Sequence, residues 1–195
     1  MTRTGSGTFF RIRFVKKVPD PFRLATVVCG LWSVVSLAGC GPEQIGSDWQ
    51  AVQPSITALD FTLPQLDGTP VTLSALKGRV VVMEFWATWC GPCRSSLPSL
   101  EVIHQRYHAR GVSVLLINEG ESEREIRRWA GRRFTAPILL DTGQAVGGQY
   151  AVRALPRLFL VDQTGRIVYA HEGYGGGLES SLSQILDRLL AASHG

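Results

Sequence analysis

The chain has 195 residues, of which 45% are hydrophobic and 18% are charged, and its formal net charge is +4. Six of its basic residues and one of its acidic residues lie in residues 1–39, which leaves 14 basic against 15 acidic groups in the rest. The positive charge therefore belongs to the N-terminal segment. Elsewhere the Arg residues alternate with Glu and form no basic stripe, which argues against nucleic acid as a partner.

The first 39 residues have the pattern of a secretory signal. A basic region up to Arg23 precedes an uncharged apolar stretch over residues 24–38, which is too short to span a bilayer comfortably. Leu37-Ala38-Gly39-Cys40 then resembles a bacterial lipobox, which implies that residues 1–39 are removed and that Cys40 receives lipid. We therefore expect a protein of the cell envelope, anchored to the bilayer through Cys40, with its domain in the periplasm or on the outer face of the cytoplasmic membrane. The alternative is an uncleaved signal that remains as a single-span anchor.

Residues 40–57 are rich in Gly, Pro, Ser and Gln and are predicted to be a flexible tether. Residues 58–195 have the length of one domain, which is long enough to bury an ordinary core.

The elements of this domain can be predicted in chain order. Paired apolar runs on either side of Asp67-Gly68 indicate a β-hairpin, and a β-branched run that begins at Val80 indicates a buried strand. Alternating helical and strand periodicity follows, with Gly111 predicted as a helix C-cap. Hairpins are predicted over residues 61–73 and 157–170, and single strands over 80–85 and 112–117. Helices are predicted over residues 93–109, 122–131, 144–150 and 178–190.

The sequence Trp89-Cys90-Gly91-Pro92-Cys93 falls between the predicted buried strand and the start of the next helix. Unpaired backbone N–H groups and the helix dipole at such a position favour a thiolate over a thiol. We therefore expect a lowered pKa for Cys90, which makes it the nucleophile, and a reversible disulfide with Cys93.

The number of cysteines agrees with this interpretation. If the chain is cleaved before Cys40 and that thiol carries lipid, Cys29 is lost and only Cys90 and Cys93 remain as free sulfurs. A domain in an oxidising compartment that keeps only two such thiols, two residues apart, is a candidate for thiol chemistry.

Together with Leu155-Pro156 and the hairpin at residues 61–73, the Trp-Cys-Gly-Pro-Cys motif makes residues 58–192 similar to the membrane-tethered thioredoxin-like proteins of the TlpA/ResA type. The resemblance implies an α/β thioredoxin-like fold, in which a mixed central sheet is flanked by helices and carries an extra N-terminal β-hairpin. It also implies that Pro156 is cis and lies beside the cysteines. Trp89, Gly91, Pro92, Leu155 and Pro156 are then the substrate-binding residues, with the backbone of Leu155 pairing with an incoming polypeptide.

Arg157 departs from the family pattern, because similar proteins usually carry Thr after that Pro. The charge and size of this side chain suggest that the partner differs too.

Glu84 lies in the run that is predicted to be buried, six positions before Cys90. A carboxyl group in an apolar site has a raised pKa. The resemblance to thioredoxin implies that Glu84 takes the proton from Cys93 and is therefore the third catalytic residue. The alternative is that strand alternation turns Glu84 to a solvated face, but Val82 and Trp86 share its parity and both are expected to point inward.

Other candidate sites are weaker. His104 and His108 have the spacing of a metal pair, but no further ligand follows nearby, so we expect no metal. The run Glu119–Arg133 alternates in charge and is predicted to be a solvated face, with Trp129 as a core anchor rather than a docking residue.

These features predict an envelope disulfide reductase whose clients are disulfide-bearing proteins, with apocytochrome c among the candidates. The sequence has no nicotinamide or flavin fingerprint, so no cofactor is expected and a membrane thiol-transferring protein would supply electrons. One alternative is a peroxiredoxin-like peroxide reductase, which is disfavoured because no Pro-x-x-x-Thr-x-x-Cys pattern surrounds Cys90. The other is a binding module in which Cys90 and Cys93 form a static disulfide.

Overall fold

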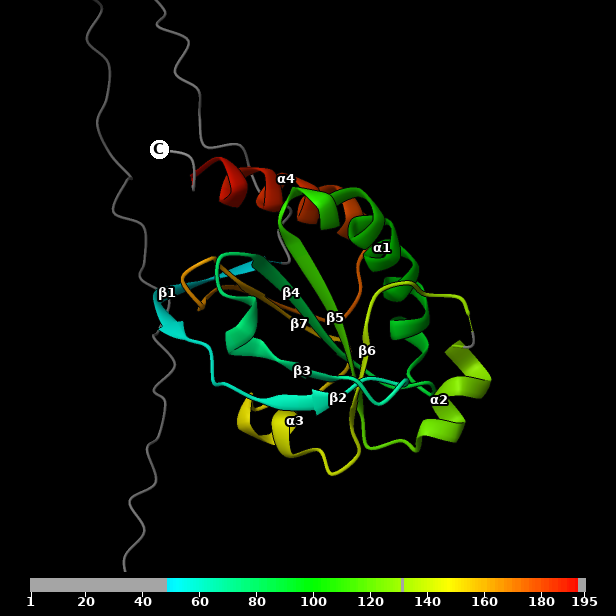
Figure 1. The fold of residues 1–195 in the computed structure, drawn as a ribbon. Helices are drawn as coiled ribbons and strands as arrows, with labels where there is room; N and C mark the ends of the chain where they lie inside the picture. The colour runs from blue at the N-terminus through cyan, green and yellow to red at the C-terminus, as the bar shows by residue number, and fades with distance from the viewer. Residues whose placement is uncertain (1–48, 131, 193–195) are drawn as a thin grey trace, which may run out of the picture. The chain divides into compact units, whose positions relative to one another are not determined.

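The structure is a computed structural model that describes residues 49–130 and 132–192, and this part of the chain is built on a six-stranded sheet (Figure 1). Three neighbouring strands run parallel and the other pairings are antiparallel, so the sheet is mixed, as the family resemblance implied. In sheet order the strands are β1 (Trp49–Thr57), β8 (Arg166–Glu172), β7 (Arg157–Val161), β4 (Val80–Trp86), β5 (Val112–Glu119) and β6 (Ile138–Asp141).

Helices cover both faces of this sheet. Figure 1 shows two long helices, α1 (Gly91–Tyr107) and α4 (Leu178–Ala191), on one face. The opposite face carries α3 (Ala145–Gln149) and a two-stranded sheet of β2 (Thr62–Pro64) and β3 (Pro70–Thr72), which is the predicted N-terminal hairpin. The remaining elements are α2 (Glu123–Ala130) and the 3-10 turns η1 (Leu73–Leu76) and η2 (His108–Arg110).

Strand β4 divides the hydrophobic core into two clusters. All seven of its residues are buried, and successive side chains point to opposite faces of the sheet. One set joins the cluster that includes buried residues of α1 and α4, and it consists of Val80, Val82 and Trp86. The other set joins the cluster on the hairpin and α3 face, and it consists of Val81, Met83 and Phe85.

Most predicted elements are confirmed within a few residues, including the hairpin, β4, β5 and α4. Gly111 ends η2 in the left-handed region, with φ at 93°, as a helix C-cap requires. Strand β6 was not predicted: its four residues follow Pro137 directly and are too few to show a period. Trp129 packs against Trp86 with their ring centroids 5.4 Å apart, which agrees with the predicted core anchor.

The prediction of a tether over residues 40–57 is wrong for Trp49–Thr57. These residues form β1, which pairs antiparallel with β8 at the edge of the sheet. Trp49 donates a hydrogen bond from its indole nitrogen to Ser181 Oγ at 3.1 Å and packs on the His171 ring. None of the nine residues of β1 is fully buried and its register is interrupted by an irregularity, so the strand lacks the alternation that identifies strands in a sequence.

Residues 1–48 lie outside the described residues. They include the predicted signal over residues 1–39, which contains Cys29, and also the predicted lipidation site Cys40 and the first part of the predicted tether. Within residues 49–130 and 132–192, no helix is both long enough and apolar enough to cross a bilayer.

Candidate active site

The two cysteines lie where β4 gives way to α1. Cys90 is the N-cap of α1, and Cys93 lies in the first turn, so the helix begins two residues earlier than predicted. Pro92 occupies one of the first helical positions, where its missing N–H costs nothing. Cys90 and Cys93 are joined by a disulfide bond, with their Cα atoms 5.3 Å apart, so the structure represents the oxidised form.

The helix N-terminus acts directly on the Cys90 sulfur. The backbone N–H of Cys93 donates a hydrogen bond to Cys90 Sγ at 3.2 Å. In the reduced protein the same donor would stabilise a thiolate on Cys90, as expected for the nucleophile. Cys90 retains a small exposed area whereas Cys93 is completely buried, which also favours Cys90 as the sulfur that meets a client.

Four of the substrate-binding residues predicted from the family resemblance can be placed relative to the disulfide turn: Gly91 and Pro92 lie within it, and Trp89, which precedes it, shares a groove with Leu155. The Leu155–Pro156 peptide bond is cis, as predicted. Trp89 is 68% exposed, and it lines a groove together with Leu155. Gly91 is exposed at the start of α1, while Pro156 is buried and its carbonyl accepts a hydrogen bond from the Gly173 N–H at 2.9 Å.

Arg157 is the first residue of β7, immediately after Pro156. Its guanidinium lies over the Phe159 ring, 5.1 Å from the centroid, and pairs with the Glu172 carboxylate at 3.2 Å. The positive charge at this position is therefore partly engaged within the domain.

Glu84 is completely buried, so the alternative of a solvated Glu84 is wrong. It shares the face of β4 with Val82 and Trp86, which pack in the same cluster as Cys93. Burial raises the pKa of the Glu84 carboxyl to about 8, although a hydrogen bond from Ser96 acts in the opposite direction. Glu84 Oε2 has no hydrogen-bond partner, which suits a carboxyl group that is protonated at neutral pH.

Ser96 connects Glu84 to the cysteine turn and was not predicted as a site residue. Its hydroxyl donates to Glu84 Oε1 at 2.6 Å and also lies 3.1 Å from the carbonyl oxygen of Cys93. Ser96 is three residues after Cys93 and one before Leu97, so it falls within the apolar stripe of α1. A polar residue within that stripe was the signal in the sequence that could have identified it.

A second carboxylate fixes the loop that precedes the disulfide. Glu121 accepts hydrogen bonds from the Thr88 N–H at 2.6 Å, from the Thr88 hydroxyl and from the Asn118 side-chain amide at 2.7 Å. On the other side of the loop, Arg94 Nε donates to the Thr88 carbonyl at 2.9 Å. These bonds hold the segment next to Trp89 from both directions.

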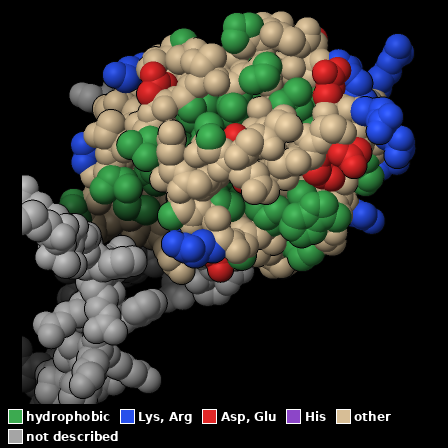
Figure 2. Space-filling view, turned by 90° about the horizontal axis from the view of Figure 1, so that it is seen from below, with side chains coloured by type: hydrophobic (Ala, Val, Ile, Leu, Met, Phe, Trp, Pro, Cys, Tyr) green, Lys and Arg blue, Asp and Glu red, His purple; other side chains and the backbone are tan. Residues whose placement is uncertain are grey.

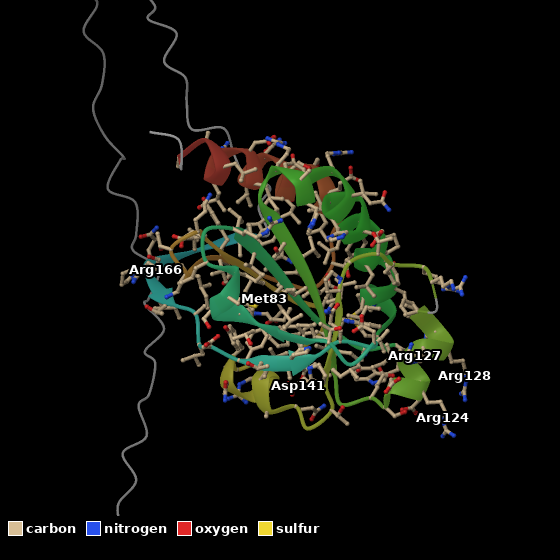
Figure 3. All side chains as sticks on the ribbon, viewed as in Figure 1. Met83, Arg124, Arg127, Arg128, Asp141 and Arg166 are labelled. Atoms are coloured by element: carbon tan, nitrogen blue, oxygen red, sulfur yellow. A yellow bond between two sulfur atoms is a disulfide. The ribbon has the colours of Figure 1, made fainter. Side chains whose placement is uncertain are left out.

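The prediction of a solvated face over Glu119–Arg133 is therefore wrong at its beginning. Glu119 is the last residue of β5 and is buried, and Glu121 is engaged by Thr88. The prediction holds for the outer side of α2: Arg124 and Arg128 project away from the domain in Figure 3, whereas the exposed Arg127 donates a hydrogen bond to the Leu66 carbonyl. Alternating charge alone could not show that these two acids, which precede the predicted helix, are engaged within the domain and not solvated.

Figure 2 shows the end of the molecule that carries α2 and α3, where the parallel strands end. Hydrophobic and uncharged side chains are exposed over the middle of this face, and Lys and Arg side chains lie towards its margins. Among residues 49–130 and 132–192, no three His, Cys, Asp or Glu side chains are grouped as a set of metal ligands.

A buried strand followed by a helix-capping Cys-Gly-Pro-Cys disulfide, with an exposed Trp directly before it and a cis proline just before β7, defines a thioredoxin-like disulfide oxidoreductase. The Redoxin family model matches residues 53–186. This chain belongs to the Redoxin family, and within it the chain is of the TlpA/ResA type.

Named relatives and solved structures agree with this assignment. The thiol-disulfide oxidoreductase ResA of Halalkalibacterium halodurans is 34% identical over 117 residues, which cover 60% of this chain and 66% of that protein. A Chlorobium tepidum structure described as a putative thiol:disulfide interchange protein DsbE is 30% identical, with a TM-score of 0.66, covering 70% of this chain and 96% of that one. The exposed lipoprotein thioredoxin Etrx1 of Streptococcus pneumoniae is also 30% identical, with a TM-score of 0.59, covering 67% of this chain and 100% of that one.

Burial of Glu84 predicts that the oxidised protein loses stability as the pH rises from about 4.5 to about 8. In this window the carboxyl is protonated in the folded protein and ionised in the unfolded chain, so the folded state binds more protons. Glu84 alone should then lower the free energy of unfolding by up to about 1.4 kcal/mol per pH unit, and Glu84→Gln should remove this contribution.

Urea denaturation of both oxidised proteins at pH values from about 4 to about 9 measures this effect. Every other titrating group is shared, so the difference between the two proteins isolates Glu84. A difference that stays constant across the window would contradict a protonated, buried Glu84.

Proposed function

We propose that this protein is a disulfide reductase of the bacterial cell envelope that transfers two electrons from the Cys90–Cys93 dithiol to disulfides in client proteins. The observation that carries the proposal is the placement of the disulfide at the N-terminus of α1. There the Cys93 N–H is directed at Cys90 Sγ, while Cys93 is shielded from solvent. Cys90, the less buried sulfur, follows the exposed Trp89, which shares a groove with Leu155, and this surface is the proposed contact for a client polypeptide.

The reaction follows the chemistry of thiol–disulfide exchange. The Cys90 thiolate attacks one sulfur of the client disulfide, forming a mixed disulfide and releasing the other client sulfur as a thiolate. Cys93 then loses its proton and attacks Cys90 Sγ, which releases the second client thiolate and forms the disulfide seen in this structure. The client gains two electrons and the dithiol loses two.

In this proposal Glu84 accepts the proton of Cys93 when Cys93 attacks. With a pKa of about 8, the Glu84 carboxyl is mostly protonated near pH 7, and its minor ionised fraction is the form that accepts the Cys93 proton. Ser96 ties that carboxyl to the turn that contains Cys93. Glu84→Gln would then slow turnover near pH 7 while leaving alkylation of Cys90 almost unchanged. Equal turnover of the two proteins would remove Glu84 from the mechanism.

The direction of electron flow is proposed from the Gly91-Pro92 pair between the cysteines. Among dithiol proteins, the reduction potentials of thioredoxin and the oxidant DsbA differ by roughly 150 mV. The residues around the two cysteines can therefore decide whether such a protein reduces or oxidises its clients. The oxidised disulfide must be reduced again, and a membrane thiol-transferring protein is the proposed electron donor.

Insulin reduction by dithiothreitol tests the catalytic claim. The wild-type protein should accelerate precipitation of the insulin B chain, and Cys90→Ser should abolish the acceleration because the remaining thiol, Cys93, is completely buried. An absence of acceleration by the wild-type protein would support the static disulfide instead. Hydrogen peroxide consumption, measured with the same thiol donor, would reveal a peroxiredoxin-like activity.

Cysteine-bearing proteins of the envelope, apocytochrome c among them, are the proposed clients. Cys93→Ala should accumulate a mixed disulfide between Cys90 and the client, because the resolving thiol is gone. Mass spectrometry of bands that disappear on reduction would identify the trapped protein. Trapping of envelope proteins without any apocytochrome would exclude cytochrome c maturation while keeping the reductase, and no trapped species would contradict the resolving role of Cys93.

Lipid attachment through Cys40 is the proposed mode of anchoring. The lipobox-like Leu37-Ala38-Gly39-Cys40 supports it, and the similar Streptococcus pneumoniae protein is described as an exposed lipoprotein. Cys40→Ser should move the protein from the membrane to the soluble fraction. If the variant stays in the membrane and has the molecular mass of the full, uncleaved chain, the signal is instead an uncleaved anchor.

A further inference from the structure

A groove of about 490 Å³ lies between α3 and Trp89, the residue that precedes Cys90. Trp89 and Leu155, the predicted client-binding residues, form part of its wall. The rest of the lining comes from the end of β5, from α3 and from the segment before Pro156, and includes Glu119, Gly147, Gly148 and Val152. A polypeptide that contacts Trp89 and Leu155 therefore passes directly over this groove.

Two acidic residues meet where β5 and β6 end. Glu119 is the last residue of β5, Asp141 is the last residue of β6, and the two are paired in the parallel register. Figure 3 shows Asp141 near α3, at the end of the sheet away from α4. The Asp141 oxygens accept hydrogen bonds from the N–H groups of Ala145 and Gly147, at 3.0 and 2.8 Å, so this carboxylate is satisfied within the domain.

Glu119 is not satisfied in the same way. Its side chain lines the groove, yet the residue is only 7% exposed and Glu119 Oε1 has no hydrogen-bond partner. Burial, followed by the neighbouring charge of Asp141 and a hydrogen bond with it, raises the pKa of the Glu119 carboxyl to about 7. A buried acceptor without a donor costs about 1–3 kcal/mol, so this carboxyl is not accounted for by the stability of the fold.

Gly147 leaves room for this carboxyl. A Cβ atom at position 147 would lie 2.3 Å from Glu119 Oε2, although the backbone there does not have a positive φ. A side chain at position 147 would therefore displace the Glu119 carboxyl from its present place, whereas the backbone conformation alone does not call for glycine. At Gly148 a Cβ atom would meet nothing within 4 Å, so no side chain crowds the groove at this point.

We propose that this groove is a subsite for a cationic side chain of the client polypeptide, and that Glu119 is the residue that selects it. The inference rests on the proposed function and extends it to the sequence around the client cysteine. A Lys or Arg side chain can lay its methylene groups along Val152 and Leu155 and bring its charged end to the unpartnered oxygen of Glu119.

The other lining residues fit the same occupant. The exposed ring of Trp89 offers a face for a cation at the mouth of the groove. Arg153 also lines the groove and carries a like charge, but it is exposed, so water screens its repulsion more strongly than it screens the attraction of the buried Glu119. An apolar side chain in the groove would leave Glu119 Oε1 without a donor.

Short peptides with one internal disulfide test this selectivity. Lys, norleucine and Glu are placed in turn at each position flanking the cysteines, and the second-order rate constant for oxidation of the pre-reduced protein is measured for each peptide. At one position the Lys peptide should react about tenfold faster than the norleucine peptide, as expected for one charge-assisted hydrogen bond. The Glu peptide should be the slowest.

The variant Glu119→Gln should bring the ratio of the Lys to the norleucine rate constant close to one. The matched control is Glu123→Gln, which removes the same charge from the exposed face of α2 and should keep the wild-type ratio. Equal rates for Lys and norleucine at every position in the wild-type protein would overturn the proposal, and so would a ratio that survives Glu119→Gln.

Binding measurements separate this proposal from the proposed reductase activity. Peptides in which Ser replaces both cysteines are titrated against the oxidised protein, and Trp fluorescence gives the ratio of the dissociation constants for the Lys and norleucine versions. Tighter binding of the Lys peptide supports the subsite even if no peptide oxidises the protein, an outcome that would contradict only the reductase. Equal binding contradicts the subsite whatever the redox result.

Discussion

The structure depends on the burial of β4 on both faces. Because side chains alternate along a strand, Val82, Glu84 and Trp86 face the helices α1 and α4, whereas Met83 and Phe85 face the hairpin side. A shift of one residue would move Glu84 into the other cluster and bring Phe85 to the disulfide side. The register of β4 against its neighbours therefore decides both the packing of the domain and the chemical surroundings of Cys93.

Much of the fold could be predicted because its central elements are long and their hydrophobic residues form clear runs or helical stripes in the sequence. β4 is an unbroken apolar run apart from Glu84, α1 and α4 each carry an apolar stripe, and the Cys-Gly-Pro-Cys motif marks the junction of β4 and α1. β6 was missed because four residues after a proline carry no measurable period. β1 was missed because an exposed edge strand without alternation cannot be distinguished from a linker by composition.

The candidate site was only partly predictable for a different reason. Cys90, Cys93 and Glu84 could be identified because they lie within or next to one buried strand. Glu119 becomes visible only when the partners of its side chain are known, since an acid in a charged run is ordinary in a sequence. Ser96 left one signal, a polar residue within the apolar stripe of α1, but its contact with Glu84 could not be inferred from that. Both are polar residues whose side-chain surroundings come from packing between different elements. Local sequence patterns do not record such contacts.

The close approach of Gly147 to Glu119 has a consequence for the evolution of this chain. With a Cβ contact of 2.3 Å, no larger residue can enter position 147 while the acid stays in place. Loss of the acid, in turn, opens a space beside the backbone that a side chain at position 147 could fill. A chain with a larger residue at position 147 would therefore need two substitutions to gain this carboxyl in its present position, whereas one substitution is enough to lose it.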